Sequence, residues 1–123
     1  MPLDVLIVDD SASIRKILHC VLVQAELPLG KVHEANDGRE ALEKMNSENI
    51  GLVLLDINMP NMDGIEMLIS LKANDALKGV PVIMITTEGS QDRVLQALKL
   101  GAAGYVRKPF TADQIKDKLT GIV

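Results

Sequence analysis

The strongest constraint on the fold of this chain is a repeated alternation of short apolar segments with helical patterns. The apolar segments are rich in Val, Ile and Leu, which is typical of strands buried on both faces of a sheet. Strands separated by helices are parallel, because a parallel connection needs a crossover. The segments expected to form strands are 5–8, 32–35, 52–55, 82–85 and 104–106.

Amphipathic helical patterns separate these strands, so five βα units follow one another. Right-handed crossovers arrange such units as an α/β protein, here a three-layer α/β/α sandwich that forms one domain over residues 1–123. Ser11 and Ser13 are the candidate N-caps of the first helix, Thr111 is the expected N-cap of the last, and Gly101 is an expected C-terminal glycine. The apolar stripes expected to face the core are Ile14, Ile17, Leu18, Val21 and Leu22 in the first helix, Ile65, Leu68, Ile69 and Leu71 in the third, and Val94, Leu95, Leu98 and Leu100 in the fourth.

Composition narrows the class of protein and of partner. A hydrophobic content of 47% with 24% charged residues fits a globular domain and is too apolar for a disordered chain. The net charge of −4, without a Lys/Arg block, argues against direct nucleic-acid binding. One cysteine, Cys20, excludes an internal disulfide and fits a reducing compartment. Without a signal peptide or an apolar run long enough for a membrane span, a cytoplasmic protein with no membrane partner is expected.

Charged and hydroxyl groups follow four of the five expected strands. They are Asp9 and Asp10 after the first strand, Asp56 after the third, Thr86 after the fourth and Lys108 after the fifth. The carboxyl ends of parallel strands meet at one edge of the sheet, where such folds bind their ligands. Carboxylates that crowd together repel unless a cation lies between them. The group therefore predicts a divalent metal ion with an anionic group held beside it.

The order of these motifs resembles the receiver domain of two-component response regulators. The likeness covers the whole chain and is strongest to the single-domain, CheY-like chemotaxis type. The motifs that carry it are Asp9-Asp10, Asp56 with Asn58-Met59-Pro60 and Asp63-Gly64, Thr86-Thr87-Glu88, and Lys108-Pro109-Phe110. The resemblance implies a flavodoxin-like, five-stranded parallel sheet of strand order 2-1-3-4-5, an order carried over from the family. It implies a monomeric signalling protein of a phosphorelay, not an enzyme.

The resemblance also assigns chemical roles. Asp56 is the implied phosphoacceptor, which takes a phosphoryl group from a histidine kinase and becomes a 4-aspartylphosphate. Lys108 neutralises one phosphoryl oxygen, and the Thr86 hydroxyl donates a hydrogen bond to another. Mg²⁺ is the implied cofactor, and its implied ligands are the Asp10 and Asp56 side chains, the Asn58 backbone carbonyl and, through water, Asp9. The Lys108–Pro109 peptide bond is expected to be cis.

The resemblance also assigns residues to the conformational change that follows phosphorylation and to the lifetime of the phosphorylated state. Tyr105 is the implied switch aromatic, whose ring turns inward as Thr86 moves toward the phosphoryl group. Asn58, Thr87 and Glu88 are expected to tune how fast the acyl phosphate hydrolyses, and Thr87 is larger than the residue usual in the family. A downstream protein is expected to bind the face formed by the fourth helix, fifth strand and fifth helix. The candidate contacts on that face are Arg93, Gln96, Lys99, Arg107 and Lys118.

Two other interpretations use the same residues. A small Mg²⁺-dependent phosphatase also combines an aspartate nucleophile with Thr or Ser and Lys. Here Asn58 stands where such an enzyme has a second aspartate as general acid, and the chain has no insertion for a substrate cap. A binding module that works without phosphorylation is expected to lack Asp56 or Lys108, and both are present. The sequence leaves the cognate kinase, the output partner and the pathway open.

Overall fold

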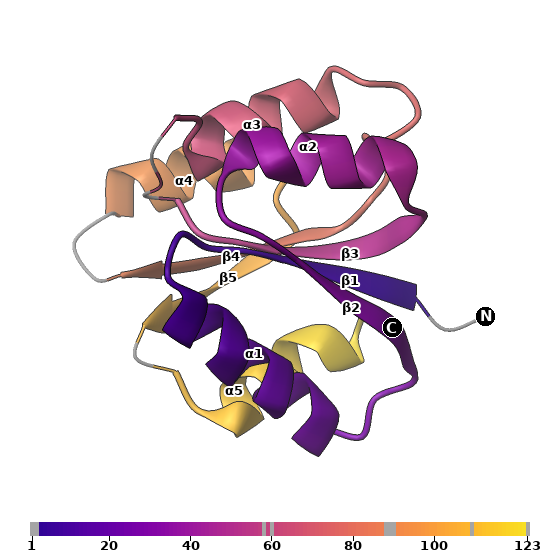
Figure 1. Cartoon of the computed structure of the whole chain (residues 1–123). Helices are drawn as coiled ribbons and strands as arrows, with labels where there is room; N and C mark the ends of the chain where they lie inside the picture. The colour runs from indigo at the N-terminus through magenta and orange to yellow at the C-terminus, as the bar shows by residue number, and fades with distance from the viewer. Residues whose placement is uncertain (1–2, 58, 60, 88–90, 109, 123) are drawn as a thin grey trace.

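Five parallel strands form one sheet in the order β2-β1-β3-β4-β5, which confirms the predicted strand order. The computed structural model describes residues 3–57, 59, 61–87, 91–108 and 110–122. Helices α1 and α5 cover one face of the sheet, and α2, α3 and α4 cover the other, as in the predicted sandwich (Figure 1). The elements are β1 (Leu3–Val8), α1 (Ala12–Gln24), β2 (Leu29–Ala35), α2 (Gly38–Ser47), β3 (Ile50–Leu55), α3 (Gly64–Lys72), β4 (Val82–Thr87), α4 (Gln91–Lys99), β5 (Gly104–Lys108) and α5 (Ala112–Thr120). Within the described residues, no helix combines the length and the apolar character that crossing a membrane requires.

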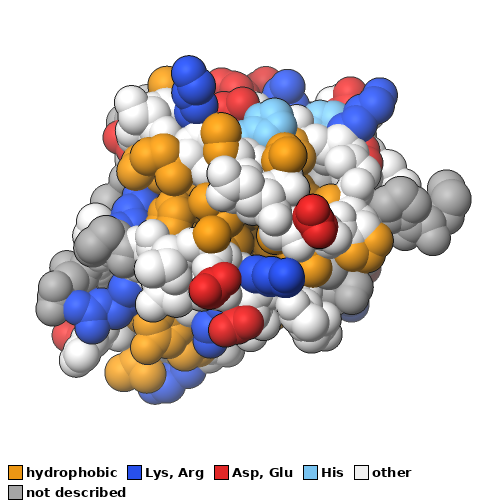
Figure 2. Space-filling model, turned by 90° about the horizontal axis from the view of Figure 1, so that it is seen from below, with side chains coloured by type: hydrophobic (Ala, Val, Ile, Leu, Met, Phe, Trp, Pro, Cys, Tyr) orange, Lys and Arg blue, Asp and Glu red, His pale blue; other side chains and the backbone are white. Residues whose placement is uncertain are grey.

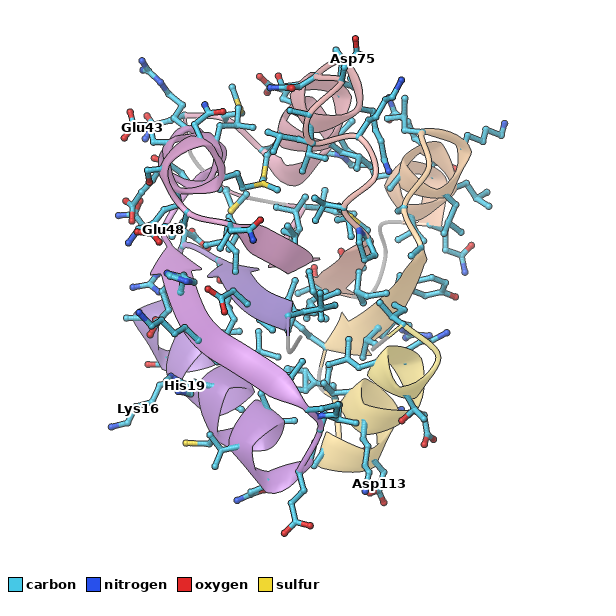
Figure 3. All side chains as sticks on the ribbon, turned by 90° about the vertical axis from the view of Figure 1, so that its right-hand side faces the viewer. Lys16, His19, Glu43, Glu48, Asp75 and Asp113 are labelled. Atoms are coloured by element: carbon cyan, nitrogen blue, oxygen red, sulfur yellow. The ribbon has the colours of Figure 1, made fainter. Side chains whose placement is uncertain are left out.

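The central strands supply side chains to two hydrophobic cores, one on each face of the sheet (Figure 3). On β1, Leu6 and Val8 enter the core beneath α2, α3 and α4, and Val5 and Ile7 enter the core beneath α1 and α5. Alternate residues of a strand point to opposite faces, so a strand buried on both faces must be apolar throughout. This is why the apolar segments of the sequence located the strands.

The helices bury narrower stripes than the sequence predicted. Ile17, Ile69, Leu95 and Leu98 were expected to face the core, but they are 49%, 47%, 56% and 37% exposed. Each helix meets the sheet along one side only, so the residues at the margin of an apolar stripe reach solvent. In α3, Met67 is fully buried although the expected stripe omitted it. On the side formed by α1 and α5, apolar side chains are visible at the surface (Figure 2).

The helix ends follow the predicted capping rules. Ser11 is the N-cap of α1, where its hydroxyl accepts a hydrogen bond from the Ile14 N–H. Thr111 caps α5 and forms a capping box with Gln114. Gly101 follows α4 with a φ of 106°, a conformation that favours glycine. Local side-chain chemistry therefore fixes where these helices begin and end.

The edge strand β2 begins at Leu29, earlier than its alternating pattern predicted, because Leu29 pairs with Leu3 of β1. The Asp4 carboxylate accepts a 2.9 Å hydrogen bond from the Lys31 N–H and lies 3.2 Å from His33 Nε2. The bond from Lys31, together with that to His33, holds the pKa of Asp4 below its ordinary value. These contacts attach β2 to β1 at its beginning and give His33 a polar partner.

Candidate functional site

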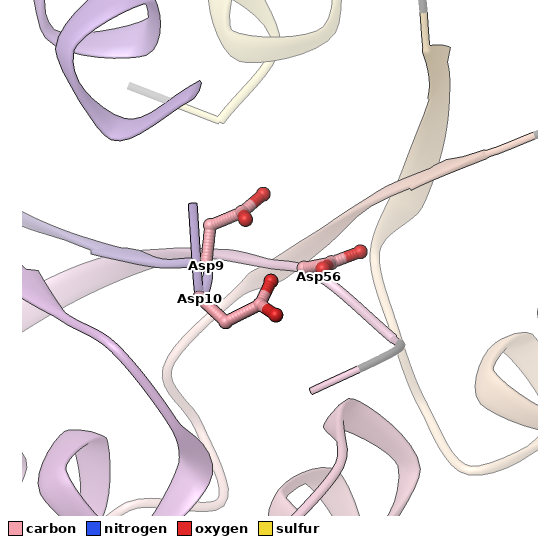
Figure 4. Close-up of side chains that lie close together, drawn as sticks. All are labelled: Asp9, Asp10 and Asp56. Atoms are coloured by element: carbon pink, nitrogen blue, oxygen red, sulfur yellow. The ribbon is translucent and has the colours of Figure 1, made fainter. Parts of the chain in front are cut away.

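Three carboxylates meet at the carboxyl ends of two neighbouring strands. Asp9 and Asp10 follow β1, Asp56 follows β3, and the two strands pair directly, with the Asp56 N–H donating to the Val8 carbonyl at 2.9 Å. One oxygen of each carboxylate lies within 4.8 Å of the others (Figure 4). Asp9 and Asp56 are buried, whereas Asp10 is exposed. Oxygen ligands of this charge and spacing could hold a hard divalent cation.

Lys108 reaches the same cluster from β5, although β4 lies between β5 and β3. Its Nζ lies 2.7 Å from Asp9 Oδ2 and 3.5 Å from Asp56 Oδ1. The ammonium group is therefore shared between the two buried carboxylates and is closer to Asp9. Its positive charge offsets part of their mutual repulsion, which is the condition for keeping two carboxylates buried side by side.

Hydrogen bonds fix both the backbone and the side chain of Asp9. Its N–H donates to the Ala35 carbonyl at 3.1 Å, its Oδ1 accepts from the Ser11 N–H at 2.9 Å, and its Oδ2 accepts from Lys108. Its own carbonyl accepts a 2.6 Å hydrogen bond from Arg15 Nη1. The residue is 1% exposed. Asp9 is thus a fixed anchor, against which the position of Lys108 is set.

The Asp56 carboxyl has a pKa raised to about 6. Burial is the main cause, the negative charge of Asp9 adds to it, and the Lys108 ammonium opposes it. At neutral pH the group is still largely ionised, yet it is more basic than an ordinary carboxylate. An ionised carboxylate beside a cationic side chain can act as a nucleophile toward an electrophilic centre.

In metal-free solution, the stability of Asp56→Asn relative to the native protein is expected to increase with pH. Folded Asp56 binds a proton near pH 6, whereas the ordinary pKa of such a group is 3.8. The folded state therefore binds more protons between these values, and this group lowers the free energy of unfolding as pH rises through that window. Asparagine does not titrate, so the difference should grow by about 2 kcal/mol from pH 4 to pH 7. Urea titrations in EDTA measure it, and a difference independent of pH would contradict the raised pKa.

Thr86 lies at the same edge of the sheet. It is the penultimate residue of β4, two positions after Met84, which pairs with Leu55, the residue before Asp56. Thr86 is 1% exposed, and its hydroxyl donates to the Thr87 carbonyl at 3.4 Å, a long hydrogen bond. A hydroxyl held this weakly can turn to a better acceptor.

Tyr105 lies on β5, away from the carboxylate cluster. It pairs with Met84 of β4 and is 38% exposed, and Lys118 Nζ of α5 lies 5.9 Å from the centre of its ring. The ring is therefore at the surface, beside a cation of the neighbouring helix.

Several expected site residues lie outside the described part of the chain. These are Asn58 and Glu88, and with Pro109 the expected cis peptide bond. Thr87 is described: it is exposed at the end of β4 and pairs with Lys108 of β5. Of the three residues expected to tune hydrolysis of the acyl phosphate, Thr87 is therefore the one whose position the structure describes.

The loop after β3 is held by contacts that the sequence analysis did not identify. Asp63 caps α3 by accepting from the Glu66 N–H at 2.9 Å, and its second oxygen accepts from Arg93 Nη2 of α4. The pattern of Asp followed three residues later by Glu signals the cap. No local pattern signals Arg93, because the pair joins two helices. Arg93, expected among the contacts for a downstream protein, makes this ion pair with the start of α3.

Gly64 lets α3 begin directly against the backbone of Asp56. Its N–H donates to the Ile57 carbonyl at 2.8 Å. A Cβ atom at this position would overlap the Asp56 carbonyl oxygen and lie 2.8 Å from Ile57 Cα. In the sequence, Asp63-Gly64 served only as one of the motifs of the family resemblance. The close approach of two backbone segments is the reason that glycine is required.

Comparisons with known proteins agree with this fold. The family model of the response regulator receiver domain matches residues 5–120. The chemotaxis protein CheY of Pseudomonas aeruginosa is 40% identical over 118 residues, which are 96% of this chain and 94% of that protein. CheY-3 of Vibrio cholerae is 39% identical and is covered to 89%. The high-resolution structure of the chemotaxis response regulator CheY4 of Vibrio cholerae superposes over the whole of both chains with a TM-score of 0.88 and 33% identity. The chain belongs to the response regulator receiver domain family.

Proposed function

We propose that this chain is a phosphorylation-activated switch of a two-component system and that Asp56 accepts the phosphoryl group. The observation that carries the proposal is the setting of Asp56, a buried carboxylate beside Asp9 and Asp10 with the Lys108 ammonium 3.5 Å away. Membership of the receiver family supports it, as does the similarity to relatives named as chemotaxis proteins. A histidine kinase is the proposed phosphodonor, and a downstream protein is the proposed target.

In the proposed reaction, an Asp56 carboxylate oxygen attacks the phosphorus of a phosphohistidine. The new P–O bond forms as the P–N bond breaks, and the departing imidazole keeps the electron pair of that bond. Lys108 holds a phosphoryl oxygen by charge and hydrogen bonding, and the Thr86 hydroxyl donates to another. These residues position and neutralise the transferring group, which is most of the catalysis that phosphoryl transfer needs.

The carboxylate cluster fits a divalent cation, because it gathers anionic oxygen ligands and keeps one side exposed. We propose that Asp10 and Asp56 hold Mg²⁺ by their side chains, Asn58 by its carbonyl, and Asp9 through water. When bound, Mg²⁺ supplies positive charge to the phosphoryl oxygens. The rate at which the acyl phosphate hydrolyses is proposed to depend on the side chains of Asn58, Thr87 and Glu88.

Incubation with acetyl phosphate tests the proposal without knowledge of the kinase. With Mg²⁺, intact-mass spectrometry is expected to show one phosphoryl adduct, and fragmentation after borohydride reduction is expected to place it on Asp56. With EDTA in place of Mg²⁺, the adduct should be absent. An adduct on another residue, or an equal yield in EDTA, would refute the proposed chemistry.

Output is proposed to run through the face formed by α4, β5 and α5, here called the output face. α4 exposes Leu95 and Leu98, and β5 exposes Tyr105. The proposed contacts on the same three elements are mostly basic, on a protein that is acidic; they are Arg93, Gln96, Lys99, Arg107 and Lys118. An amphipathic or acidic segment of the partner would complement both features. If the partner prefers the phosphorylated arrangement, it also stabilises that arrangement by linkage.

Asp10→Asn is expected to stabilise the metal-free protein and to weaken Mg²⁺ binding. The substitution removes one of three crowded negative charges, so repulsion in the absence of metal falls while one ligand for the metal is lost. Thermal melting with and without Mg²⁺ measures both effects. Asp75→Asn, which removes an exposed carboxylate outside the cluster (Figure 3), should leave the Mg²⁺ response unchanged. An Asp10→Asn protein that Mg²⁺ stabilises as much as the native one would contradict a metal site at Asp10.

A further inference from the structure

Arg15 makes contacts that the proposed reaction does not use. It lies in the first turns of α1, and its side chain is 17% exposed. Its Nη1 donates to the Asp9 carbonyl at 2.6 Å, and its Nε donates to Glu34 Oε1 of β2 at 2.9 Å. One guanidinium group therefore joins α1, the turn after β1 and the edge strand β2.

The carbonyl that Arg15 holds belongs to the peptide group that links Asp9 to Asp10. A peptide group is planar, so the direction of this carbonyl sets the direction in which the chain continues to the Asp10 Cα. The Asp9 side chain is held separately by Ser11 and Lys108. Asp10 is exposed, so the place of its carboxylate depends strongly on the backbone that carries it.

We propose that Arg15 is a positioning residue for the metal site: by fixing the Asp9–Asp10 peptide group, it holds the Asp10 carboxylate beside Asp56. The inference rests on the proposed function, since it takes Asp10 and Asp56 as metal ligands. Groups that orient metal ligands typically alter metal affinity by about 10–100-fold when they are removed.

Whether Mg²⁺ affinity falls or rises when Arg15 is replaced distinguishes a positioning role from a purely electrostatic one. A positive charge beside the carboxylates repels a cation, so the loss of the charge alone would strengthen Mg²⁺ binding. The loss of positioning would weaken it. Lys16→Gln is the matched control, because Lys16 is the next residue of α1, is exposed and extends away from the protein (Figure 3). It removes the same charge without a contact to Asp9.

The experiment is a Mg²⁺ titration of the folded proteins, followed by the amide NMR signals of Asp10 and Asp56. Arg15→Gln is expected to bind Mg²⁺ about tenfold more weakly than the native protein, the low end of such effects. Lys16→Gln should bind it equally or slightly more tightly. Arg15→Lys keeps the charge but should also bind Mg²⁺ more weakly, because lysine has a single ammonium nitrogen, whereas Arg15 uses two separate nitrogens, Nη1 for Asp9 and Nε for Glu34. A merely structural role for Arg15 would lower the melting temperature and leave the affinity of the folded protein unchanged.

An Arg15→Gln protein that binds Mg²⁺ as tightly as the native protein, or more tightly, would overturn the inference. If that variant does not fold, Arg15→Lys is judged by the same criterion. A native protein without saturable Mg²⁺ binding would overturn the metal site of the proposed function and this inference with it. A native protein that binds Mg²⁺ while the Arg15 variants bind it equally well would overturn the inference alone.

Discussion

Asp56→Asn is expected to abolish phosphorylation by acetyl phosphate. An amide is a much weaker nucleophile than a carboxylate. Asp9 is not expected to replace Asp56, because both of its carboxylate oxygens already accept hydrogen bonds, one from the Ser11 N–H and one from Lys108. The side chains have nearly the same size, so the variant should fold. Intact-mass spectrometry after incubation with acetyl phosphate and Mg²⁺ measures the yield.

Asp37→Asn is the control for this experiment. Asp37 is also an aspartate after a strand of the sheet, and it caps α2 by accepting from the Glu40 N–H. Asparagine caps helices as well as aspartate does, so the control should fold and be phosphorylated to the native yield. Full phosphorylation of Asp56→Asn would refute the assignment, and loss of phosphorylation in Asp37→Asn would show that the assay responds to any change near the loops.

Gly64→Ala is expected to cost about 3 kcal/mol of stability, because the added methyl group overlaps the Asp56 carbonyl and neither backbone segment can yield cheaply. For a chain of this length, that corresponds to a fall of about 10 °C in the melting temperature. Folded Gly64→Ala protein should be phosphorylated about a hundredfold more slowly than the native protein, since a shift of about 1 Å in a reacting group has effects of this size.

Gly79→Ala is the matched control, because a Cβ atom at Gly79 meets nothing within 4 Å. Its stability should stay within about 0.5 kcal/mol of the native value, and its phosphorylation should be unchanged. Equal melting temperatures for Gly64→Ala and the native protein would contradict the close approach of α3 to Asp56. A destabilised Gly64→Ala that is phosphorylated at the native rate would contradict the role of this contact in placing Asp56.

The parts of the fold that the sequence predicted are those set by local patterns. The strands were located because residues such as Leu6 and Ile7 must be apolar on both faces of the sheet. The caps at Ser11 and Thr111 depend on bonds to residues three positions away. The strand order came from the family resemblance, since periodicity does not say which strands are neighbours.

The parts that the sequence did not predict depend on contacts between distant segments. Lys108 Nζ lies closer to Asp9 than to Asp56, and only the folded sheet defines this difference in distance. The contacts of Arg15 with Asp9 and of Arg93 with Asp63 likewise join elements that no short motif connects. The exposure of Leu95 was also not predicted, because a helical pattern does not show how much of the apolar stripe the neighbouring elements cover.

The central claim is that a phosphoryl group on Asp56 changes the output face, and beryllofluoride tests it directly as a stable mimic of that group. Backbone and Tyr105 side-chain NMR spectra would be compared before and after its addition with Mg²⁺. We expect large shifts around Asp56 and Thr86 and a second set along α4, β5 and α5, with the Tyr105 ring signals among those that move most. Shifts confined to the carboxylate cluster, with Tyr105 and the output face unchanged, would contradict the account.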